Sequence, residues 1–390
     1  MLLHLSDKEY SVLMQVYKAK SIPRADLTKS SKLKSASLYR CVDSLLKYGY
    51  LISKENHAQI STSPGRPSDL VALNPTIGYS MNVSLWRRNC HVALLDFSGK
   101  TLCEDQIAFE GVPSASIFNS QLNNTVQRLI GMLPTTVKLL GISIAIVGLL
   151  DKEGQKVLKL THNPFPFTQN LSLSKIFGNE FDAPVIVNNI TSCAAVGYQI
   201  SHADTENMSY IFVDEGIANH TIIHGESLPS KRYTINGFGH MTVSLDGNKC
   251  ECGSYGCLET YCSAHSIAKE VRSSIKLGMD CQLQGNVDNI TFRDVCVAAQ
   301  NGDILCRDVI RRAAAIFCVG LNNYIQLLPV DSLVFSGSVI NETPLFSQIV
   351  QEEMSHRSWK GTMYRDTNIQ DSVSLGCHTL LLQRLFSEES

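Results

Sequence analysis

The sequence predicts an α/β protein in which an N-terminal winged helix-turn-helix precedes two α/β lobes. The first 74 residues follow the order helix, short helix, turn, helix and two-stranded wing. Beyond them, two three-strand meanders are each followed by alternating helices and strands. We therefore expect a DNA-binding domain over residues 1–74, a first lobe over 75–200 and a second lobe over 201–390, with the C-terminal helix returning to the first lobe.

The N-terminal helices are indicated by caps and by helical spacing of apolar residues. Ser6-Asp7-Lys8-Glu9 is a capping box, in which Ser6 is the N-cap and Glu9 stands three residues later. Ser21-Ile22-Pro23 is expected to break this helix, and a short helix over 24–29 follows. A third helix over 35–48 ends before Gly49, the expected C′ residue. The wing strands are expected at 50–52 and 70–73, on either side of a polar loop.

A winged helix-turn-helix places its third helix in the major groove of DNA. Residues 1–70 carry eleven Lys and Arg against six Asp and Glu, a balance of +5 in a chain of net charge −2. This basic N-terminal segment suits a polyanion. The expected partner is a double-stranded DNA operator, contacted by the outer face of the third helix and by an arginine of the wing turn Pro64-Gly65-Arg66-Pro67: Lys34, Ser35, Ser37, Tyr39, Arg40 and Arg66.

The two lobes are predicted from strand and helix patterns. The first lobe has strands at 79–85, 89–95 and 101–108, a helix at 114–132, a buried strand at 139–150, a strand at 184–187 and a helix at 189–200. The second has strands at 210–213, 221–223 and 332–335 and helices near 260–277, 303–328 and 377–386. No apolar run reaches the ~20 residues of a membrane span, so we expect a cytoplasmic protein without membrane contact.

A histidine and three cysteines cluster within the second lobe. His240, Cys250, Cys252 and Cys257 lie within eighteen residues, and glycines surround the thiols. Such a set matches a closed tetrahedral Zn²⁺ site, which is structural because no coordination position stays open. Disulfides or ordinary buried cysteines are the alternatives. The 13 cysteines are an odd number and the N-terminus has no signal-peptide pattern, so reduced thiols and a metal are favoured.

Three segments together resemble one family. They are the wing, the Asn-Asn and Ala-Ala pairs between Val187 and Ala195, and the Gly-His that precedes C-x-C-G-x-x-G-C-L-E-T. Over essentially its whole length the chain resembles the ROK family, and within it the branch of xylose, N-acetylglucosamine and Mlc-type repressors. The resemblance implies an actin-like hexokinase fold, a sugar in the interlobe cleft, a structural zinc, and a homodimer or homotetramer.

The chain departs from the kinases of this family at their phosphate loops and at their base. The family's Asp-x-Gly-Gly-Thr loop corresponds to residues 84–88, which contain neither glycine nor carboxylate. The second loop corresponds to residues 215–219, with one glycine, and the third to residues 336–338. Asn189 replaces the catalytic aspartate, and an amide cannot accept the sugar hydroxyl proton. The sequence therefore predicts no catalytic residue and no enzyme.

The resemblance also implies sugar contacts, which we assign to Gly148, Asn188, Asn189, His240 and Glu259. One expected contact is missing, because Gly237 stands where the family has glutamate. We predict a sugar-responsive transcriptional regulator, a repressor released by a sugar or sugar phosphate in the cleft. Two alternatives stay open: a DNA-binding regulator controlled by a partner protein, with a vestigial sugar site, and a residual ROK sugar kinase.

Overall fold

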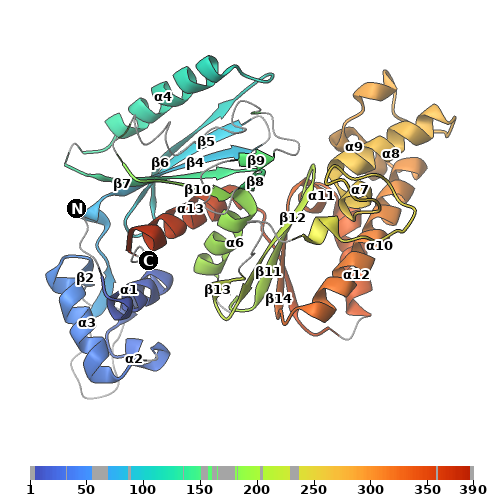
Figure 1. Cartoon of the computed structure of the whole chain (residues 1–390). Coiled ribbons are helices and arrows are strands. Elements are labelled where there is room, and N and C mark those ends of the chain that lie inside the picture. Colours follow the sequence, from blue (N-terminus) through green and yellow to red (C-terminus); the bar gives the residue numbers. More distant parts are fainter. Residues whose placement is uncertain are drawn as a thin grey trace. The chain divides into compact units, whose positions relative to one another are not determined.

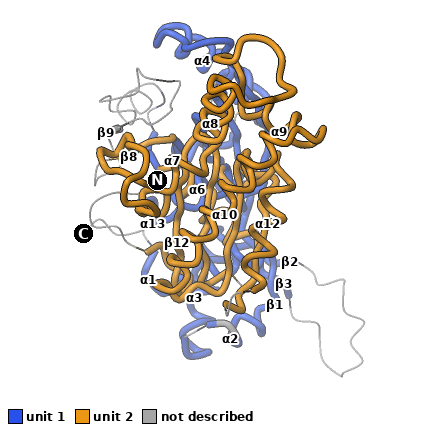
Figure 2. Tube along the Cα trace, turned by 90° about the vertical axis from the view of Figure 1, so that its right-hand side faces the viewer, with its two compact units in different colours: residues 1–146, 171–188, 374–390 blue, residues 147–170, 189–373 orange. Residues whose placement is uncertain are grey.

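The chain forms two compact units in the computed structural model (Figure 2). The structure describes residues 5–31, 33–54, 69–86, 89–134, 136–150, 157–159, 165, 181, 183–202, 205–228, 237–356 and 359–386. Unit 1 comprises residues 1–146, 171–188 and 374–390, and unit 2 comprises residues 147–170 and 189–373. The division into three domains at residues 74 and 200 stays a prediction, since the contacts group the N-terminal segment with the sheet that follows it.

The N-terminal segment contains helices packed on a three-stranded antiparallel sheet of order β1-β3-β2. The predicted capping box of Ser6 and Glu9 is present. The predicted break of the first helix at 21–23 is confirmed, since α1 ends at Ala19. Unexpectedly, residues 21–23 also form a strand that pairs with β3; proline is tolerated there since the strand lies at the sheet edge. The elements are α1 (Asp7–Ala19), β1 (Ser21–Pro23), α2 (Leu27–Ser30), α3 (Ser35–Lys47), β2 (Leu51–Lys54) and β3 (Leu70–Leu73).

A five-stranded sheet of order β10-β7-β4-β5-β6 follows, entered through η1 (Pro75–Ile77). The predicted meander is confirmed, and β7 runs parallel to β4. The apolar run predicted as one strand to Leu150 ends at Ile146, before Gly148 with a φ of 139°. The elements are β4 (Tyr79–Trp86), β5 (Asn89–Asp96), β6 (Thr101–Ala108), α4 (Ala115–Gly131), β7 (Leu139–Ile146), β8 (Leu149–Leu150), β9 (Val157–Lys159) and β10 (Val185–Asn189).

Helices cover both faces of this sheet (Figure 1). Helix α4 lies on one face and buries Phe118, Leu122 and Val126. Helix α13 (Ile369–Phe386) lies on the other, and it begins earlier than the predicted residue 377. The sequence underestimates α13 because buried serine, threonine and histidine side chains interrupt its apolar pattern.

Helix α13 also holds the N-terminal segment against the sheet. His378 Nδ1 lies 2.7 Å from Ser80 Oγ of β4, and Tyr17 of α1 shares a hydrogen bond of 3.1 Å with Thr379. His378 and Thr379 are fully buried. One turn of α13 therefore contacts both the first lobe and the first helix of the chain.

The buried histidine predicts a pH dependence of stability. Burial lowers the pKa of His378 to about 4. The Phe97 backbone and the Asp96 carboxylate act in the opposite direction, because they favour protonation, but their effect is smaller. Because the unfolded chain binds a proton near pH 6.5, we expect the free energy of unfolding to fall by about 1 kcal/mol per such histidine from pH 7.5 to 5.5. Burial also lowers the pKa of His220 to about 4. His378→Gln should halve this pH slope in urea unfolding, and an unchanged slope would contradict the assignment.

Unit 2 contains a second sheet, of order β13-β12-β11-β14-β15, with the same arrangement of antiparallel and parallel pairs next to its central strand. Helix α6 lies on one face and α10 on the other (Figure 1). Tyr324 of α10 bonds Ser209 of β11 at 2.7 Å. The elements are α6 (Ile190–Ser201), β11 (Met208–Val213), β12 (Ile217–Ile223), β13 (Glu226–Ser227), α10 (Ile304–Leu327), β14 (Ser332–Ser336) and β15 (Thr362–Arg365).

Among the remaining helices of unit 2, α7, α8, α9 and α12 pack on α10. The helix predicted over 260–277 is two helices, because Ser263 is extended and caps the second of them. None of the described helices is both long and apolar enough to cross a membrane. The elements are η3 (Phe238–His240), α7 (Glu259–Cys262), α8 (Ala264–Lys276), η4 (Val287–Asn289), α9 (Phe292–Gln300), α11 (Ser338–Asn341) and α12 (Pro344–Ser355).

Candidate metal centre and ligand-contacting residues

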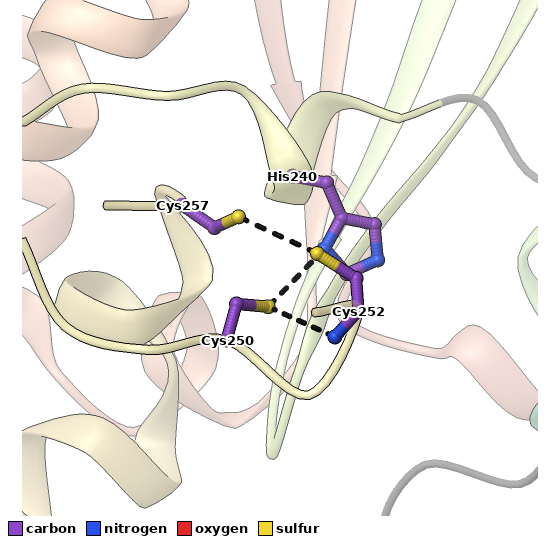
Figure 3. Close-up of side chains that lie close together, drawn as sticks. All are labelled: His240, Cys250, Cys252 and Cys257. Carbon is purple, nitrogen blue, oxygen red and sulfur yellow. Dashed lines mark hydrogen bonds between the residues drawn. The ribbon is translucent and has the colours of Figure 1, made fainter. Parts of the chain in front are cut away.

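The structure brings the predicted metal ligands together (Figure 3). One ligand atom from each of His240, Cys250, Cys252 and Cys257 lies within 4.8 Å of all the others. The Sγ atoms of Cys252 and Cys257 are 3.7 Å apart, and Cys250 Sγ is 3.6 Å from His240 Nδ1. Sulfurs on a tetrahedral ion with bonds of about 2.3 Å lie about 3.8 Å apart, so the spacing of the cluster suits a metal ion.

The segment from His240 to Cys257, here called the knuckle, is closed by backbone pairing. Val243 N donates to Gly256 O at 2.8 Å, and Thr242 forms an antiparallel bridge with Cys257. Gly256 has a φ of 67°, and a Cβ there would lie 1.8 Å from Ser244 O. Only glycine therefore fits between the paired segments.

Burial of the thiols is consistent with a bound cation. Burial raises the pKa of Cys250 and of Cys257. Partial burial also acts on Cys252, but hydrogen bonds, chiefly from the Ser254 backbone N–H, lower its pKa overall. Buried thiolates are unfavourable unless a positive charge compensates them, and a metal ion would supply that charge.

Asn219 holds the start of η3, the short helix that ends at His240, a role that its place at the end of the second phosphate-loop segment does not indicate. Its Oδ1 accepts from Phe238 N at 3.1 Å, and its Nδ2 donates to Tyr324 OH at 2.8 Å. A Cβ on Gly239 would lie 2.3 Å from Ile217 O, so η3 packs directly on β12. These contacts depend on residues far apart in the chain, and no local pattern signals them.

Glu259 connects the knuckle to the predicted sugar contacts. Its Oε1 lies 3.3 Å from His240 Nδ1 and 3.1 Å from Cys250 Sγ. Glu259 is the first residue of α7, and its side chain is 17% exposed. Glu259, a predicted sugar contact, therefore forms one cluster with two predicted metal ligands, His240 and Cys250. Displacement of the knuckle would displace the Glu259 carboxylate.

The other predicted sugar residues lie around the end of β10. Asn189 caps α6: its Oδ1 accepts from Thr191 N at 2.8 Å, and its Nδ2 donates to Gly148 O at 3.0 Å. The neighbouring Asn188 has a buried Nδ2 without a hydrogen-bond partner among the described residues. The side chain of Asn189 is thus engaged in the fold, whereas the buried amide of Asn188 is an unpaired donor in the described part of the chain.

Asn189→Asp is expected to destabilise the protein rather than to restore a catalytic base. Aspartate keeps the helix cap, but it has no proton to donate to Gly148 O and places a carboxylate against that carbonyl. We expect a loss of about 1–3 kcal/mol in the free energy of unfolding. Urea unfolding measures it, with Asn188→Asp as the matched neighbour. A stability equal to that of the wild type would contradict the hydrogen-bond assignment.

The predicted DNA-contacting side chains lie on and before the start of α3. Lys34, Ser35, Tyr39 and Arg40 are exposed, Ser37 is half-buried, and Arg66 lies outside the described residues. Arg24, which the sequence did not single out, lies 5.0 Å from the centre of the Tyr39 ring and pairs with Asp43. Arg24 therefore restrains the exposed face of α3 from the preceding segment.

Comparison with known proteins establishes the family. The ROK family model matches residues 83–374. The chain belongs to the ROK family. The xylose repressor of Caldicellulosiruptor bescii is 24% identical over 386 residues, 96% of this chain and 95% of the relative. The transcriptional regulator NagC of Escherichia coli is 25% identical over 320 residues, 82% of this chain and 77% of the relative.

Solved ROK structures share the fold. A ROK transcriptional regulator described as a homologue of the Escherichia coli Mlc protein matches with a TM-score of 0.76 and 23% identity, over 97% of this chain and 99% of the other. A ROK glucokinase from Streptomyces griseus matches with a TM-score of 0.64 and 20% identity, over 78% and 100%. The actin-like ROK fold with mixed α/β sheets is thereby confirmed.

Proposed function

We propose that this ROK protein is a sugar-responsive, DNA-binding transcriptional regulator, a repressor released when a sugar or sugar phosphate binds its cleft. One observation carries the proposal. The chain combines an N-terminal helical segment, which has an exposed polar helix face, with a ROK domain in which Asn189 replaces the catalytic aspartate of the family's kinases. Similarity to the xylose repressor over 96% of the chain supports it.

The N-terminal segment suits DNA as a winged helix-turn-helix. Helix α3 would enter the major groove with Arg40 and Lys34 exposed. A homodimer or homotetramer would present two such helices to a roughly palindromic operator. The surplus of basic residues in this segment would add phosphate contacts, which make affinity depend on salt.

The positions of the kinase phosphate loops favour a regulator over a kinase. In the turn between β11 and β12, the buried Asp214 accepts a hydrogen bond from Ser338 Oγ at the start of α11. Glu215 follows it in the same turn. Carboxylates at this place would repel the phosphates of a nucleotide. Together with the engaged amide of Asn189, this argues that the chain has no kinase activity.

A structural Zn²⁺ in the knuckle is part of the proposal. The donor set of one imidazole and three thiols is that of closed zinc sites, which add stability and no chemistry. His240, Cys250, Cys252 and Cys257 would hold the ion, and this would fix η3 relative to α7. An effector that contacts Glu259 and Asn188 would favour one arrangement of the protein only if its affinity differs between the two states.

Gly237 favours a second candidate, a regulator controlled by a partner protein. A Cβ on Gly237 would meet no atom of the described structure within 4 Å, so the space beside this residue is open. A sugar would lose one charged hydrogen bond at this place, worth about 1.5–3 kcal/mol. A weakened sugar site with an intact DNA-binding segment fits control by a protein.

DNA binding decides between these candidates. The full chain is titrated at fixed salt with DNA from upstream of its own gene, with and without sugars and sugar phosphates. Arg40→Ala should weaken binding by roughly 5- to 150-fold, whereas Arg311→Ala, an exposed arginine of α10, should not. Release by one sugar supports the first candidate. Specific binding that no sugar alters, even in Gly237→Glu, supports the second, and loss of specificity for this DNA overturns both.

A further inference from the structure

A second group of metal-ligating side chains lies in unit 2, away from the knuckle in sequence and sharing no residue with it. Ligand atoms of Cys281, Asp303 and Cys306 all lie within 4.8 Å of one another. Cys281 belongs to the loop that follows α8, Asp303 is the N-cap of α10, and Cys306 lies in the first turn of that helix. The group therefore joins a loop to the start of the 24-residue α10.

The carboxylate of this group is held in place by the backbone. Asp303 Oδ1 accepts from Cys306 N at 2.7 Å, and Oδ2 accepts from Gln282 N at 2.7 Å. Asp303 is 2% exposed and Cys306 is fully buried, whereas Cys281 is partly exposed. Each carboxylate oxygen keeps a second lone pair, so the group is oriented by the fold and still able to ligate.

The two thiols converge on the same carboxylate. Their Sγ atoms are 4.0 Å apart, close to the separation of about 3.8 Å expected for two sulfurs on one tetrahedral ion. Burial raises the pKa of Asp303, but the backbone N–H groups of Gln282 and Cys306 and both thiols lower it more, so its pKa lies below the usual value. A buried anion thus faces two S–H protons that a cation would replace.

We propose that Cys281, Asp303 and Cys306 form a second metal site, for a thiophilic divalent cation such as Zn²⁺. Binding would displace one proton from each thiol, leaving two thiolates and one carboxylate on the ion with a net charge of −1. Only three protein ligands are present, so the fourth position would take water from the side of the partly exposed Cys281. The site differs from the knuckle in being open.

A disulfide between the two cysteines is the competing reading. It would leave the buried carboxylate of Asp303 without a positive charge nearby, whereas a divalent cation held by the three side chains would supply that charge.

The test counts bound metal. Full-length protein, stripped by a chelator under reducing conditions, is titrated with Cd²⁺ while the ultraviolet thiolate-to-metal band is recorded. Cys281→Ser and Asp303→Asn should each bind one equivalent fewer than the wild type at the same concentrations. Cys103→Ser, which changes a partly buried thiol of β6 in unit 1, should bind as the wild type does.

Asp303→Asn keeps the helix cap, because asparagine caps a helix as well as aspartate and retains an acceptor for Cys306 N, but it loses the acceptor for Gln282 N. Cys281→Ser, which changes a partly exposed thiol in a loop, therefore guards against a folding artefact. An unchanged equivalent count in both Cys281→Ser and Asp303→Asn would overturn the proposal. A thiol count in denaturant gives the second test. The proposal would also be overturned if wild-type protein purified without reductant shows two fewer free thiols than after reduction and Cys281→Ser shows no such difference. That result would identify a disulfide.

Discussion

Replacement of Cys257 by serine is expected to remove one metal equivalent and to destabilise unit 2. Cys257 is fully buried, and its backbone pairs with Thr242 while the next residue, Leu258, donates to Met241 O at 2.9 Å. A structural zinc contributes its binding free energy to folding, and loss of one thiolate removes much of it. With a loss of about 3 kcal/mol, Tm should fall by roughly 6–12 °C for a unit of this size.

The control for this prediction is Cys262→Ser. Cys262 is buried five residues later, and its Sγ donates to Ala313 O at 3.1 Å, a bond that a serine hydroxyl can also form. Metal content is measured by mass spectrometry of desalted protein and Tm by calorimetry. Equal metal content in Cys257→Ser and Cys262→Ser would show that the knuckle holds no ion.

The same variant tests whether the knuckle transmits the effector signal. Glu259 contacts both His240 and Cys250, so a knuckle without metal should displace the carboxylate proposed to contact the sugar. We expect Cys257→Ser to bind operator DNA but to lose its release by the effector. A metal-free variant that is released normally would refute this coupling while leaving the structural role of the ion intact.

Local signals in the sequence predict local structure well in this chain. The capping box before α1 and the strand meander of the first lobe are confirmed because their determinants lie within a few residues of one another. The knuckle spacing likewise predicts a cluster that the structure assembles. In each case the interacting atoms are close in the chain, so their pattern is visible without the fold.

Features that depend on distant partners could not be predicted. Pro23 forms a strand only because β3 pairs with it. His378 interrupts an apolar pattern, yet it is buried because Ser80 bonds its ring. The contact of Cys281 with Asp303 and Cys306 spans more than twenty residues and depends on how the loop after α8 folds back. Asn189 stays a predicted sugar contact, but the hydrogen bond of its amide to Gly148, 41 residues away in the chain, is signalled by no local pattern.

The second large effect is expected at the end of α13. Phe386 is 2% exposed, and its ring centre lies 5.5 Å from that of Tyr50 before β2 and 6.2 Å from that of Phe97 after β5. The Tyr50 and Phe97 centres are 6.0 Å apart. These three rings join the N-terminal segment, the first sheet and α13. Phe386→Ala should cost about 3–5 kcal/mol of stability because it leaves a cavity at their meeting point.

Hydrogen exchange distinguishes loss of docking from general loss of stability. Phe346→Ala is the matched control, because Phe346 is equally buried but packs on Phe317 in unit 2 at 5.4 Å. Phe386→Ala should accelerate exchange in α1 and β2 at temperatures where unit 2 stays protected, and Phe346→Ala should do the reverse. Equal acceleration of α1 by both variants would contradict a docking role for the ring cluster.

Helix α13 contains residues of both units. The helix begins in unit 2, to which residues 369–373 belong, and continues in unit 1, to which residues 374–390 belong. Its second part contacts Tyr17 and Tyr50 of the N-terminal segment. If α13 carries an effector signal to the proposed DNA-binding segment, Phe386→Ala should weaken the effect of effector on operator binding more than it weakens operator binding itself.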